Sequence, residues 1–467
     1  MLSINKFSST ILVMLLILFV SSIDCMTTSQ YLSNYVISSN ENKIFLEQKQ
    51  HIPQTLLNHE PILITNEQNF TDYGFPGNGT AINPYRIENL NISTTENIAI
   101  AVYNVNVFYT ISNCLVTADR YGIYIENTSN YDEIFDSYLP IATFVNNTCY
   151  NSWRGMYISQ AWNCTAHNNT CNNNEQYGLT VEDSWYSTIT NNTCSNNFEG
   201  IVLLGSYTSL AINNYCFNNF IGLTIWNSLG VDAFNNTCVF NTLYGLELIL
   251  NYADVYENNC SYNGEAGIRL VGASWSNIFN NFCSNNKYGI YNKDAFWANI
   301  TVNICSSNNC GIFLTLGSFY DNLFNNNCTQ NSFYGVYVEQ AKDCTFMYNF
   351  ISTNTLHGMY FTNNTLGSII AFNSFKDNNL GGTSQAYDDG EGNVWFDEEH
   401  HMGNHWSGWI GEDYPIDGLA CSVDLYPLDE NLERLPSTSE SHLLYSVLSI
   451  WLVTLIVKYL RKKPNIN

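Results

Sequence analysis

Hydrophobic and polar residues alternate in short pieces along most of the chain, and each piece follows a glycine. In Gly200-Ile201-Val202-Leu203, one residue separates two apolar positions on the same face, as in a β-strand. These pieces do not place apolar residues at i, i+3, i+4 and i+7, so they do not predict helices. The glycines recur every 22 to 24 residues, after a first interval of 33 that indicates an insertion near residues 127–141. They are Gly122, Gly155, Gly178, Gly200, Gly222, Gly245, Gly267, Gly289, Gly311, Gly335 and Gly358.

Two further columns keep the same period. A cysteine column runs through Cys149, Cys171, Cys194, Cys216, Cys238, Cys260, Cys283, Cys305 and Cys328 and continues as Ile351 and Phe375. Asn stands two residues before every member of this column, and a second Asn stands three residues after each member from Cys171 onward. Aligned copies at one fixed period predict a repeat architecture.

The period and the alternation together predict an all-β parallel β-helix solenoid. Each copy has room for two or three short strands, and stacked copies pair strand on strand about 4.8 Å apart. We expect about twelve coils, with positions +1 and +3 after each glycine facing inward and +2 facing solvent. The glycines are expected to hold positive-φ turns, and the Asn columns to form amide ladders. The structural ladder comprises Asn192, Asn214, Asn236, Cys194, Cys216, Cys238, Gly200, Gly222 and Gly245.

Composition narrows the class of partner. Asp and Glu number 41 against 16 Lys and Arg, which gives a net charge of −25. Phosphate neutralisation needs a basic face, so we expect no nucleic-acid partner. Hydrophobic residues make up 45% of the chain, which argues against a disordered polar protein.

Both ends of the chain resemble targeting segments. Lys6 and the apolar run after it are typical of a secretory signal peptide. A mostly apolar segment followed by basic residues predicts a single C-terminal membrane span with the body outside the cell. The expected organisation is a signal peptide at 1–25, an N-terminal linker at 26–59, a β-helix domain at 60–428 (cap 60–92, coils 93–385, cap 386–428), a polar stalk at 429–442, a transmembrane helix at 443–460 and a cytoplasmic basic tail at 461–467.

The segments that flank the coils carry a family resemblance. The first contains Gly74-Phe-Pro-Gly-Asn-Gly-Thr80, and the second contains Gly403-Asn-His-Trp406 and Asp424-Leu-Tyr-Pro-Leu428. With the coils, they resemble the right-handed β-helix proteins called NosD-like, which have PbH1-type repeats and belong to the pectin-lyase-like group. The resemblance covers about residues 60–428 and implies a right-handed solenoid. The namesake is linked to copper supply, and the family's calcium-site-like loop is shortened here to 411–418. Copper and calcium are therefore the possible cofactors, and neither is assigned.

Two sets of residues are candidates for metal binding. We place ten of the fifteen cysteines, including Cys114, in the cysteine column. Its apolar continuation favours packing, with soft-metal binding or disulfides between adjacent coils as alternatives. The second set is a His-dense stretch of the C-terminal cap, which suits copper or zinc unless it is a solvated loop. It comprises His400, His401, Met402 and His405.

Outward aromatic residues give the leading functional hypothesis. A ribbon of rings suits sugar faces or a partner protein, while the alternative is that the rings only stack on one another. At +2 stand Tyr124, Tyr157, Tyr291, Phe313, Tyr337 and Tyr360, and in the following loops stand Trp162, Trp185, Trp275 and Trp297.

Catalytic residues are harder to find. Sugar cleavage needs converging carboxylates, but outward acids such as Glu126 and Glu339 lie on separated coils. Glu247 is expected to pair with Arg269 one coil on, and His357 occupies a column otherwise rich in Tyr. We assign no catalytic residue. The sequence thus favours an exported, membrane-anchored surface protein that binds carbohydrate or a surface polymer. The alternatives are an extracellular polysaccharide lyase or hydrolase and a NosD-like copper-binding accessory protein.

Overall fold

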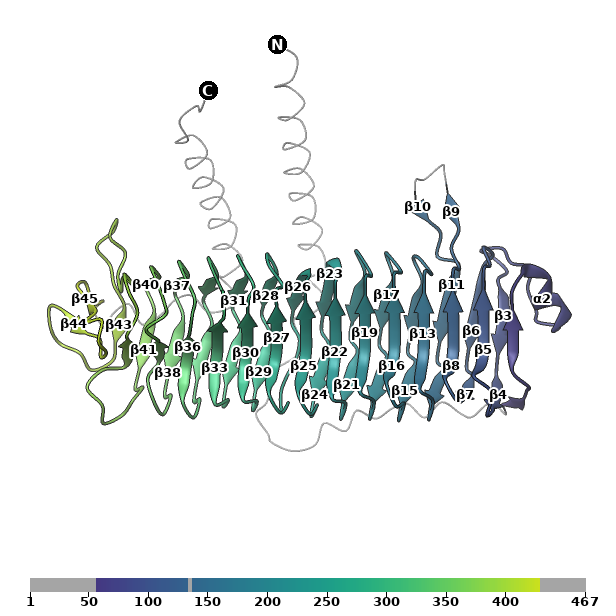
Figure 1. Cartoon of the computed structure of the whole chain (residues 1–467), viewed down its shortest axis with the longest axis horizontal. Helices are drawn as coiled ribbons and strands as arrows, with labels where there is room; N and C mark the ends of the chain where they lie inside the picture. The colour runs from purple at the N-terminus through teal and green to yellow at the C-terminus, as the bar shows by residue number, and fades with distance from the viewer. Residues whose placement is uncertain (1–55, 133–136, 429–467) are drawn as a thin grey trace, which may run out of the picture. The chain divides into compact units, whose positions relative to one another are not determined.

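One copy of the repeat shows how the chain closes a coil. Residues 177–195 form three strands, β16 (Tyr177–Glu182), β17 (Thr188–Thr190) and β18 (Thr193–Ser195). Each strand pairs in parallel with its counterparts in the coils before and after. The protein is described by a computed structural model, which covers residues 56–132 and 137–428 (Figure 1). The predicted parallel β-helix is confirmed.

The described coils contain three parallel sheets. Sheet 1 has fourteen strands: β2 (Ile62–Ile64), β5 (Ile98–Tyr103), β8 (Tyr121–Glu126), β13 (Arg154–Ser159), β16, β19 (Glu199–Leu204), β22 (Ile221–Trp226), β25 (Tyr244–Ile249), β27 (Ala266–Val271), β30 (Tyr288–Lys293), β33 (Cys310–Thr315), β36 (Tyr334–Val338), β39 (Met359–Phe361) and β42 (Ala386–Asp388). Sheet 2 has thirteen: β3 (Tyr85–Glu88), β6 (Tyr109–Ser112), β11 (Ala142–Val145), β14 (Thr165–His167), β17, β20 (Leu210–Ile212), β23 (Leu229–Phe234), β26 (Tyr252–Tyr256), β28 (Asn277–Phe279), β31 (Asn299–Thr301), β34 (Asn322–Phe324), β37 (Thr345–Met347) and β40 (Ile369–Ala371).

Sheet 3 is interrupted once. Its first eight strands are β1 (Leu57–Asn58), β4 (Leu90–Ser93), β7 (Leu115–Thr117), β12 (Thr148–Tyr150), β15 (Thr170–Asn172), β18, β21 (Tyr215–Phe217) and β24 (Thr237–Val239). After an isolated bridge at Asn259, six more follow: β29 (Phe282–Ser284), β32 (Ile304–Ser306), β35 (Asn327–Thr329), β38 (Phe350–Ser352), β41 (Ser374–Lys376) and β43 (His405–Trp406). The coils exceed the expected twelve because the cap segments add strands such as β2 and β42 to sheet 1.

The interior of the coils is apolar. Leu179 and Val181 on β16 hold the +1 and +3 positions and have no exposed surface, as predicted. The cysteine column is also fully shielded, and each thiol in it is free. Burial raises the pKa of the Cys194 and Cys305 thiols, which keeps them protonated at neutral pH. The column therefore packs as part of the core.

Cys114 does not belong to this column. Val116 of β7 is the residue that pairs with Cys149, so the column holds nine cysteines and not the expected ten. Cys114 lies where later coils have a ladder Asn, and its N–H donates to Asn147 Oδ1 at 3.1 Å. The prediction was wrong because the long first interval hides the register of this coil.

The Asn columns form two amide ladders inside the turns. In the first, Asn192 Nδ2 donates to Asn214 Oδ1 at 3.0 Å and to the Ala166 carbonyl at 2.9 Å. The Asn192 backbone N–H donates to the same Asn214 oxygen at 3.0 Å. Each side chain thus satisfies turn backbone groups that would otherwise be buried without partners.

The repeat glycines do not adopt positive φ, which corrects the sequence-based expectation. A Cβ on Gly200 would lie 2.5 Å from the Gly222 carbonyl oxygen and 2.9 Å from Asn219 Nδ2. Glycine is needed here because the next coil and its amide ladder approach too closely for a side chain. The left-handed corners are held instead by exposed asparagines such as Asn191 and Asn213, with φ of 55° and 54°.

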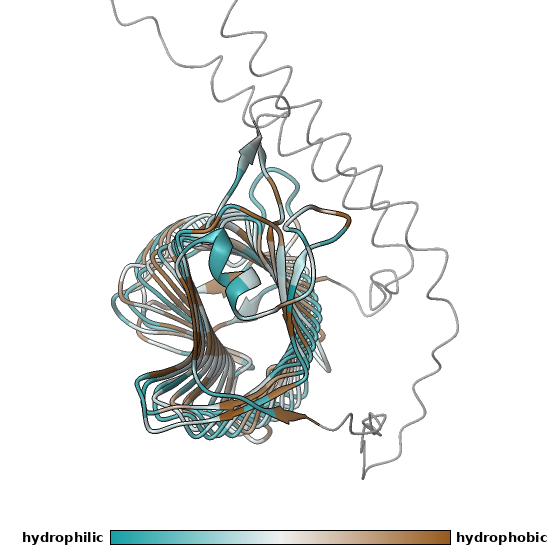
Figure 2. Ribbon diagram, turned by 90° about the vertical axis from the view of Figure 1, so that its right-hand side faces the viewer, coloured by the Kyte–Doolittle hydropathy of each residue, from teal (hydrophilic) through white to brown (hydrophobic). Residues whose placement is uncertain are grey.

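Both ends of the described solenoid are capped. Helix α2 (Glu67–Asp72) lies across the first coil (Figure 2), and its Phe70 is buried in the core. At the other end, the buried Asp424 accepts from Trp406 Nε1 at 2.9 Å. Asp424 lies on β45 (Val423–Asp424), which pairs with β44 (Tyr414–Pro415). The tryptophan thus closes the core without an unpaired indole N–H.

The predicted insertion is seen in the structure, whereas most of the predicted terminal segments lie outside the described residues. The insertion projects as a hairpin of β9 (Tyr131–Asp132) and β10 (Ser137–Tyr138) (Figure 1). The expected signal peptide, most of the N-terminal linker, the stalk, the transmembrane helix at 443–460 and the basic tail lie outside the described residues. Within residues 56–132 and 137–428, no helix has the length and apolar character of a membrane span.

Candidate functional site

The outer face of sheet 1 carries six of the ten predicted ring residues. We call the +2 residues of five successive strands the ring ladder: Tyr291, Phe313, Tyr337, Tyr360 and Tyr387 on β30, β33, β36, β39 and β42. They follow one another because in-register parallel strands place equivalent side chains in one column. A neighbouring column adds two more rings, Tyr288 and Tyr334.

Three of the four neighbouring ring pairs in the ladder stack, and the fourth, Phe313 with Tyr337, meets edge-on at 68°. Tyr360 and Tyr387 have centroids 4.5 Å apart and an interplanar angle of 2°, while Tyr337 and Tyr360 are 5.5 Å apart at 14°. Such stacking covers the ring faces and leaves edges and hydroxyls outward. The ladder is therefore mainly a strip of ring edges and phenol groups.

Carboxylates flank the phenol groups. Tyr387 Oη donates to Asp389 Oδ2 at 3.1 Å, and burial together with this carboxylate raises the Tyr387 pKa to about 12. Burial and the nearby Glu339 raise the pKa of Tyr337 to about 12 as well. Both phenols stay protonated at neutral pH, so they act as hydrogen-bond donors and acceptors.

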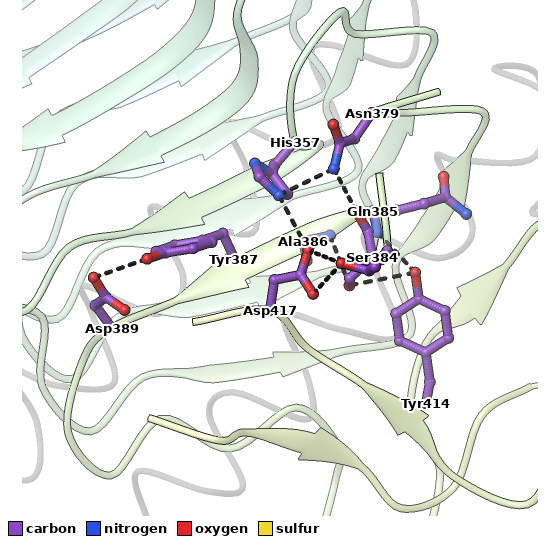
Figure 3. A network of polar contacts seen from close by, with 10 residues as sticks. His357, Asn379, Ser384, Gln385, Ala386, Tyr387, Asp389, Tyr414 and Asp417 are labelled. Atoms are coloured by element: carbon purple, nitrogen blue, oxygen red, sulfur yellow. Dashed lines mark hydrogen bonds and ion pairs between the residues drawn. The ribbon is translucent and has the colours of Figure 1, made fainter. Parts of the chain in front are cut away.

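The ladder ends at a polar cluster around His357 (Figure 3). His357 Nε2 lies 3.1 Å from Asn379 Nδ2 and 3.7 Å from Asp417 Oδ2. Asp417 also accepts from Thr383 Oγ1 at 2.7 Å. The His357 ring lies 5.4 Å from the Tyr387 ring, and its side chain is 17% exposed. Burial lowers the His357 pKa more than Asp417 raises it, which favours a neutral imidazole.

A second network holds the loop beside this cluster. Asn379 Nδ2 donates to the Ser384 carbonyl at 2.9 Å, and the Gln385 N–H donates to Tyr414 Oη at 2.7 Å (Figure 3). Tyr414 stacks on Trp406 with centroids 3.9 Å apart. The polar cluster is thus fixed by contacts with the C-terminal cap.

The N-terminal rings form a separate group. Tyr124 and Tyr157 are 5.2 Å apart, and their hydroxyls donate to Glu126 at 3.1 Å and to Glu182 at 2.6 Å. Arg154 lies 5.1 Å from the Tyr157 ring centroid. This group resembles the ring ladder in chemistry, with phenols bonded to carboxylates.

The two ring groups do not form one continuous ribbon. Between them, the +2 column holds Thr180, Val202, Thr224 and Glu247, all buried. Glu247 forms the predicted ion pair with Arg269. The loop tryptophans stack in pairs away from this column, Trp162 on Trp185 at 5.2 Å and Trp275 on Trp297 at 5.4 Å. The predicted ring residues therefore fall into four groups.

The sequence pattern missed the partners of His357. Asn379, Asp417, Tyr387 and Asp389 lie past the last clear repeat, so no column marks them. The one available signal was His357 itself, which replaces Tyr in its column.

The His-dense stretch does not assemble into a ligand set. His400 is exposed and bonds Asp397 at 2.9 Å, while His401 packs against Tyr426 at 4.9 Å. His405 is 4% exposed on β43. Met402 forms a backbone bridge to Asp397. Within the described part of the chain, no three His, Cys, Asp or Glu side chains gather where they could hold a metal ion.

The coil architecture defines a parallel β-helix protein. The chain matches the family model described as periplasmic copper-binding protein (NosD) over residues 60–243, 200–317 and 258–411. These matches span well over half of its length, so the chain belongs to the NosD family. No curated protein matches it.

Several solved structures are similar in fold. The periplasmic alginate epimerase AlgG has 13% identity, with 67% of this chain and 83% of that chain covered and a TM-score of 0.37. The Azotobacter vinelandii mannuronan C-5 epimerase AlgE6 A-module has 14% identity, covers 72% and 88%, and has a TM-score of 0.35. Bacteriophage CBA120 tailspike protein 3 has 13% identity, covers 74% and 62%, and has a TM-score of 0.41.

The family description raises the question of whether the described residues fit copper. The cap side chains do not converge, as shown above. The column thiols are core groups with no exposed surface, and the same slot holds the apolar residues Ile351 and Phe375. A soft-metal site needs deprotonated, converging ligands. The described residues therefore do not fit a copper site.

Proposed function

We propose that this protein binds carbohydrate along the outer face of sheet 1 and that it is exported and anchored at the cell surface. One observation carries the proposal. Five successive coils present a ring in one outward column, and the column ends beside His357, Asn379 and Asp417. A repeating surface suits a ligand that itself repeats, as a polysaccharide does.

The chemistry of the ladder suits sugar hydroxyls. Carboxylates accompany two of the phenol groups, with Glu339 beside Tyr337 and Asp389 beside Tyr387. Sugars offer hydroxyl donors and acceptors together with apolar C–H edges. Ligand sites commonly combine aromatic walls with a few placed polar groups. Because ring faces are covered, we expect contacts through hydroxyls and ring edges.

Replacing Tyr337→Ser and Tyr360→Ser together tests this proposal. Full-length protein is probed on a glycan array, and the double variant should lose at least about tenfold in affinity, because both hydroxyls and both ring edges leave the strip. Stability should fall by only about 1–2 kcal/mol, since the rings lie outside the core. Phe234→Ser with Tyr256→Ser is the matched control, because it removes a pair stacked at 4.8 Å from sheet 2.

Three outcomes are informative. Unchanged glycan binding by the ladder variant would refute the ladder as the binding face. A large fall in melting temperature would instead show that the rings exist mainly to stack.

Protease treatment of intact cells tests the surface location, and it should remove the β-helix domain. Protection of that domain would contradict the proposed orientation.

A second candidate function rests on His357. A neutral imidazole beside a carboxylate and a ring edge has the features of a general base in a polysaccharide-active enzyme. Incubation with the polymer that binds best, followed by analysis of chain length and sugar composition, tests this. Turnover that is lost in His357→Asn but kept in Tyr337→Ser would support catalysis, and an unchanged polymer would count against it.

A further inference from the structure

A groove of about 570 Å³ lies at the corner between sheet 3 and sheet 1. It crosses the coils that contain β15, β18 and β21, and it is separate from the ring ladder, which begins at β30. Its volume falls within the range of small-molecule sites, about 300–1,000 Å³. The groove is therefore large enough for part of an oligosaccharide.

Three exposed amides stand in register along this groove. Asn173, Asn196 and Asn218 occupy the same corner of successive coils, and each has φ of 55°. Because the three residues have the same backbone φ and lie one coil apart, their side chains leave the backbone in the same direction. The groove thus offers a row of equivalent donors and acceptors.

These amides have no hydrogen-bond partners among the residues that the structure describes. At the other corner of the coil, Asn168 Nδ2 donates to Asn146 Oδ1 at 2.6 Å and Asn191 Nδ2 lies 3.4 Å from His167 Nδ1, while the Asn213 side chain has no partner among the described residues. The buried ladder amides below the groove are also engaged, since Asn174 Nδ2 donates to Asn197 Oδ1 at 3.0 Å. The groove amides alone keep their full bonding capacity in this turn, so a ligand can use it without breaking a protein bond.

One wall of the groove is aromatic. Phe198 stacks on Phe220 with centroids 4.8 Å apart at 13°, and Phe198 is 46% exposed. In the preceding coil this wall position is Glu175, so one side of the Phe198 ring faces no other ring in the described residues. In the ring ladder, by contrast, Tyr360 is stacked between Tyr337 and Tyr387. A sugar ring can stack here.

The charge of the lining indicates the class of ligand. Glu175 is the one ionisable residue that lines the groove, and no cation lines it. Amide groups bond neutral hydroxyls well, whereas a polyanion would meet a carboxylate without a compensating charge. We propose that this groove is a second glycan site that binds a neutral, unbranched oligosaccharide, with one sugar against Phe198 and its neighbours on the three amides.

The test measures binding of cellulose and chitin oligosaccharides to the full-length protein by calorimetry, with oligogalacturonate as the acidic counterpart. The variant carries Asn173→Gly, Asn196→Gly and Asn218→Gly, because glycine accepts positive φ and removes only the amides. Asn285→Gly is the matched control, an exposed corner residue with φ of 58° outside the groove. We expect a neutral oligosaccharide to bind wild type and the control alike and the triple variant at least about tenfold more weakly.

Comparison with the ladder variant separates this proposal from the proposed function. If Tyr337→Ser with Tyr360→Ser abolishes binding while the triple variant binds and melts like wild type, the groove proposal is wrong and the ladder proposal holds. Tighter binding of oligogalacturonate would overturn the neutral class. Failure of wild type to bind any of the three probes would overturn the groove proposal. Phe198→Leu, which keeps an apolar wall without a ring, should weaken binding in its own right.

Discussion

The inner and outer columns belong to the same repeating coil but face different demands. Inside, Asn214 accepts from Asn192 in one adjacent coil and donates to Asn236 in the other, so two neighbours require its identity. On the outer face of sheet 1, successive +2 residues change from Glu247 to Arg269 without disturbing strand pairing. In this protein, the inner residues that repeat in every coil therefore serve stability. The outward residues that vary from coil to coil occupy the positions where binding can evolve.

The largest effect should follow a charge in the inner cysteine column. Cys216→Asp places a carboxylate in a fully shielded apolar slot and should destabilise the fold by about 3–5 kcal/mol or more. Cys216→Ile should be tolerated far better, because the same column holds Ile351. Chemical denaturation of both variants measures the difference. Equal stability would show that the column does not face the core.

An intermediate effect should follow loss of one ladder amide. Asn214→Leu leaves the Asn192 amide and backbone N–H without their shared acceptor, at a cost of about 2–4 kcal/mol. The adjacent Asn213→Gly is the control, because that exposed corner residue has φ of 54° and glycine fits it without strain. A smaller loss in Asn214→Leu than in Asn213→Gly would contradict the role of the ladder.

The contrast between columns also explains what the sequence could predict. The period, the inward positions and the Asn ladders follow from residues that recur every 22 to 24 positions, and each has one physical role in every coil. The role of the glycines was misjudged because a repeat reveals a small residue but not which atom excludes the side chain. Here that atom is the carbonyl oxygen of the next coil, such as Gly222 O over Gly200.

The candidate sites were predicted only in part. The ring ladder residues Tyr337 and Tyr360 repeat, so they could be found, but their stacking angle could not. Asp417 reaches His357 from a cap that lies 60 residues further along the chain, and no periodicity connects the two. The groove was missed because Asn173 has the same residue type as many corner positions. Other exposed corner residues such as Asn213 also lack side-chain partners, so the nearby Phe198 is what distinguishes it.

The smallest predicted effect tests the outer face of sheet 2 through its pH dependence. Asp232 on β23 pairs in register with Asp254 on β26, and burial together with this second carboxylate raises the Asp232 pKa to about 6. The Asp232 pKa in the folded state lies above its unfolded value of about 3.9. Protonation of Asp232 therefore contributes fully to the free energy of unfolding below about pH 3.9, and this contribution is lost as the pH rises through about 6. Asp232→Asn should therefore raise the melting temperature at pH 7.5, by about 1–2 °C because solvent screens a partly exposed pair, and should have little effect at pH 4. Asp119→Asn, which removes an exposed carboxylate on another coil, serves as the control. A stabilisation by Asp232→Asn that is equal at the two pH values would show that ionisation of the carboxylate pair is not what lowers the stability of this outward column.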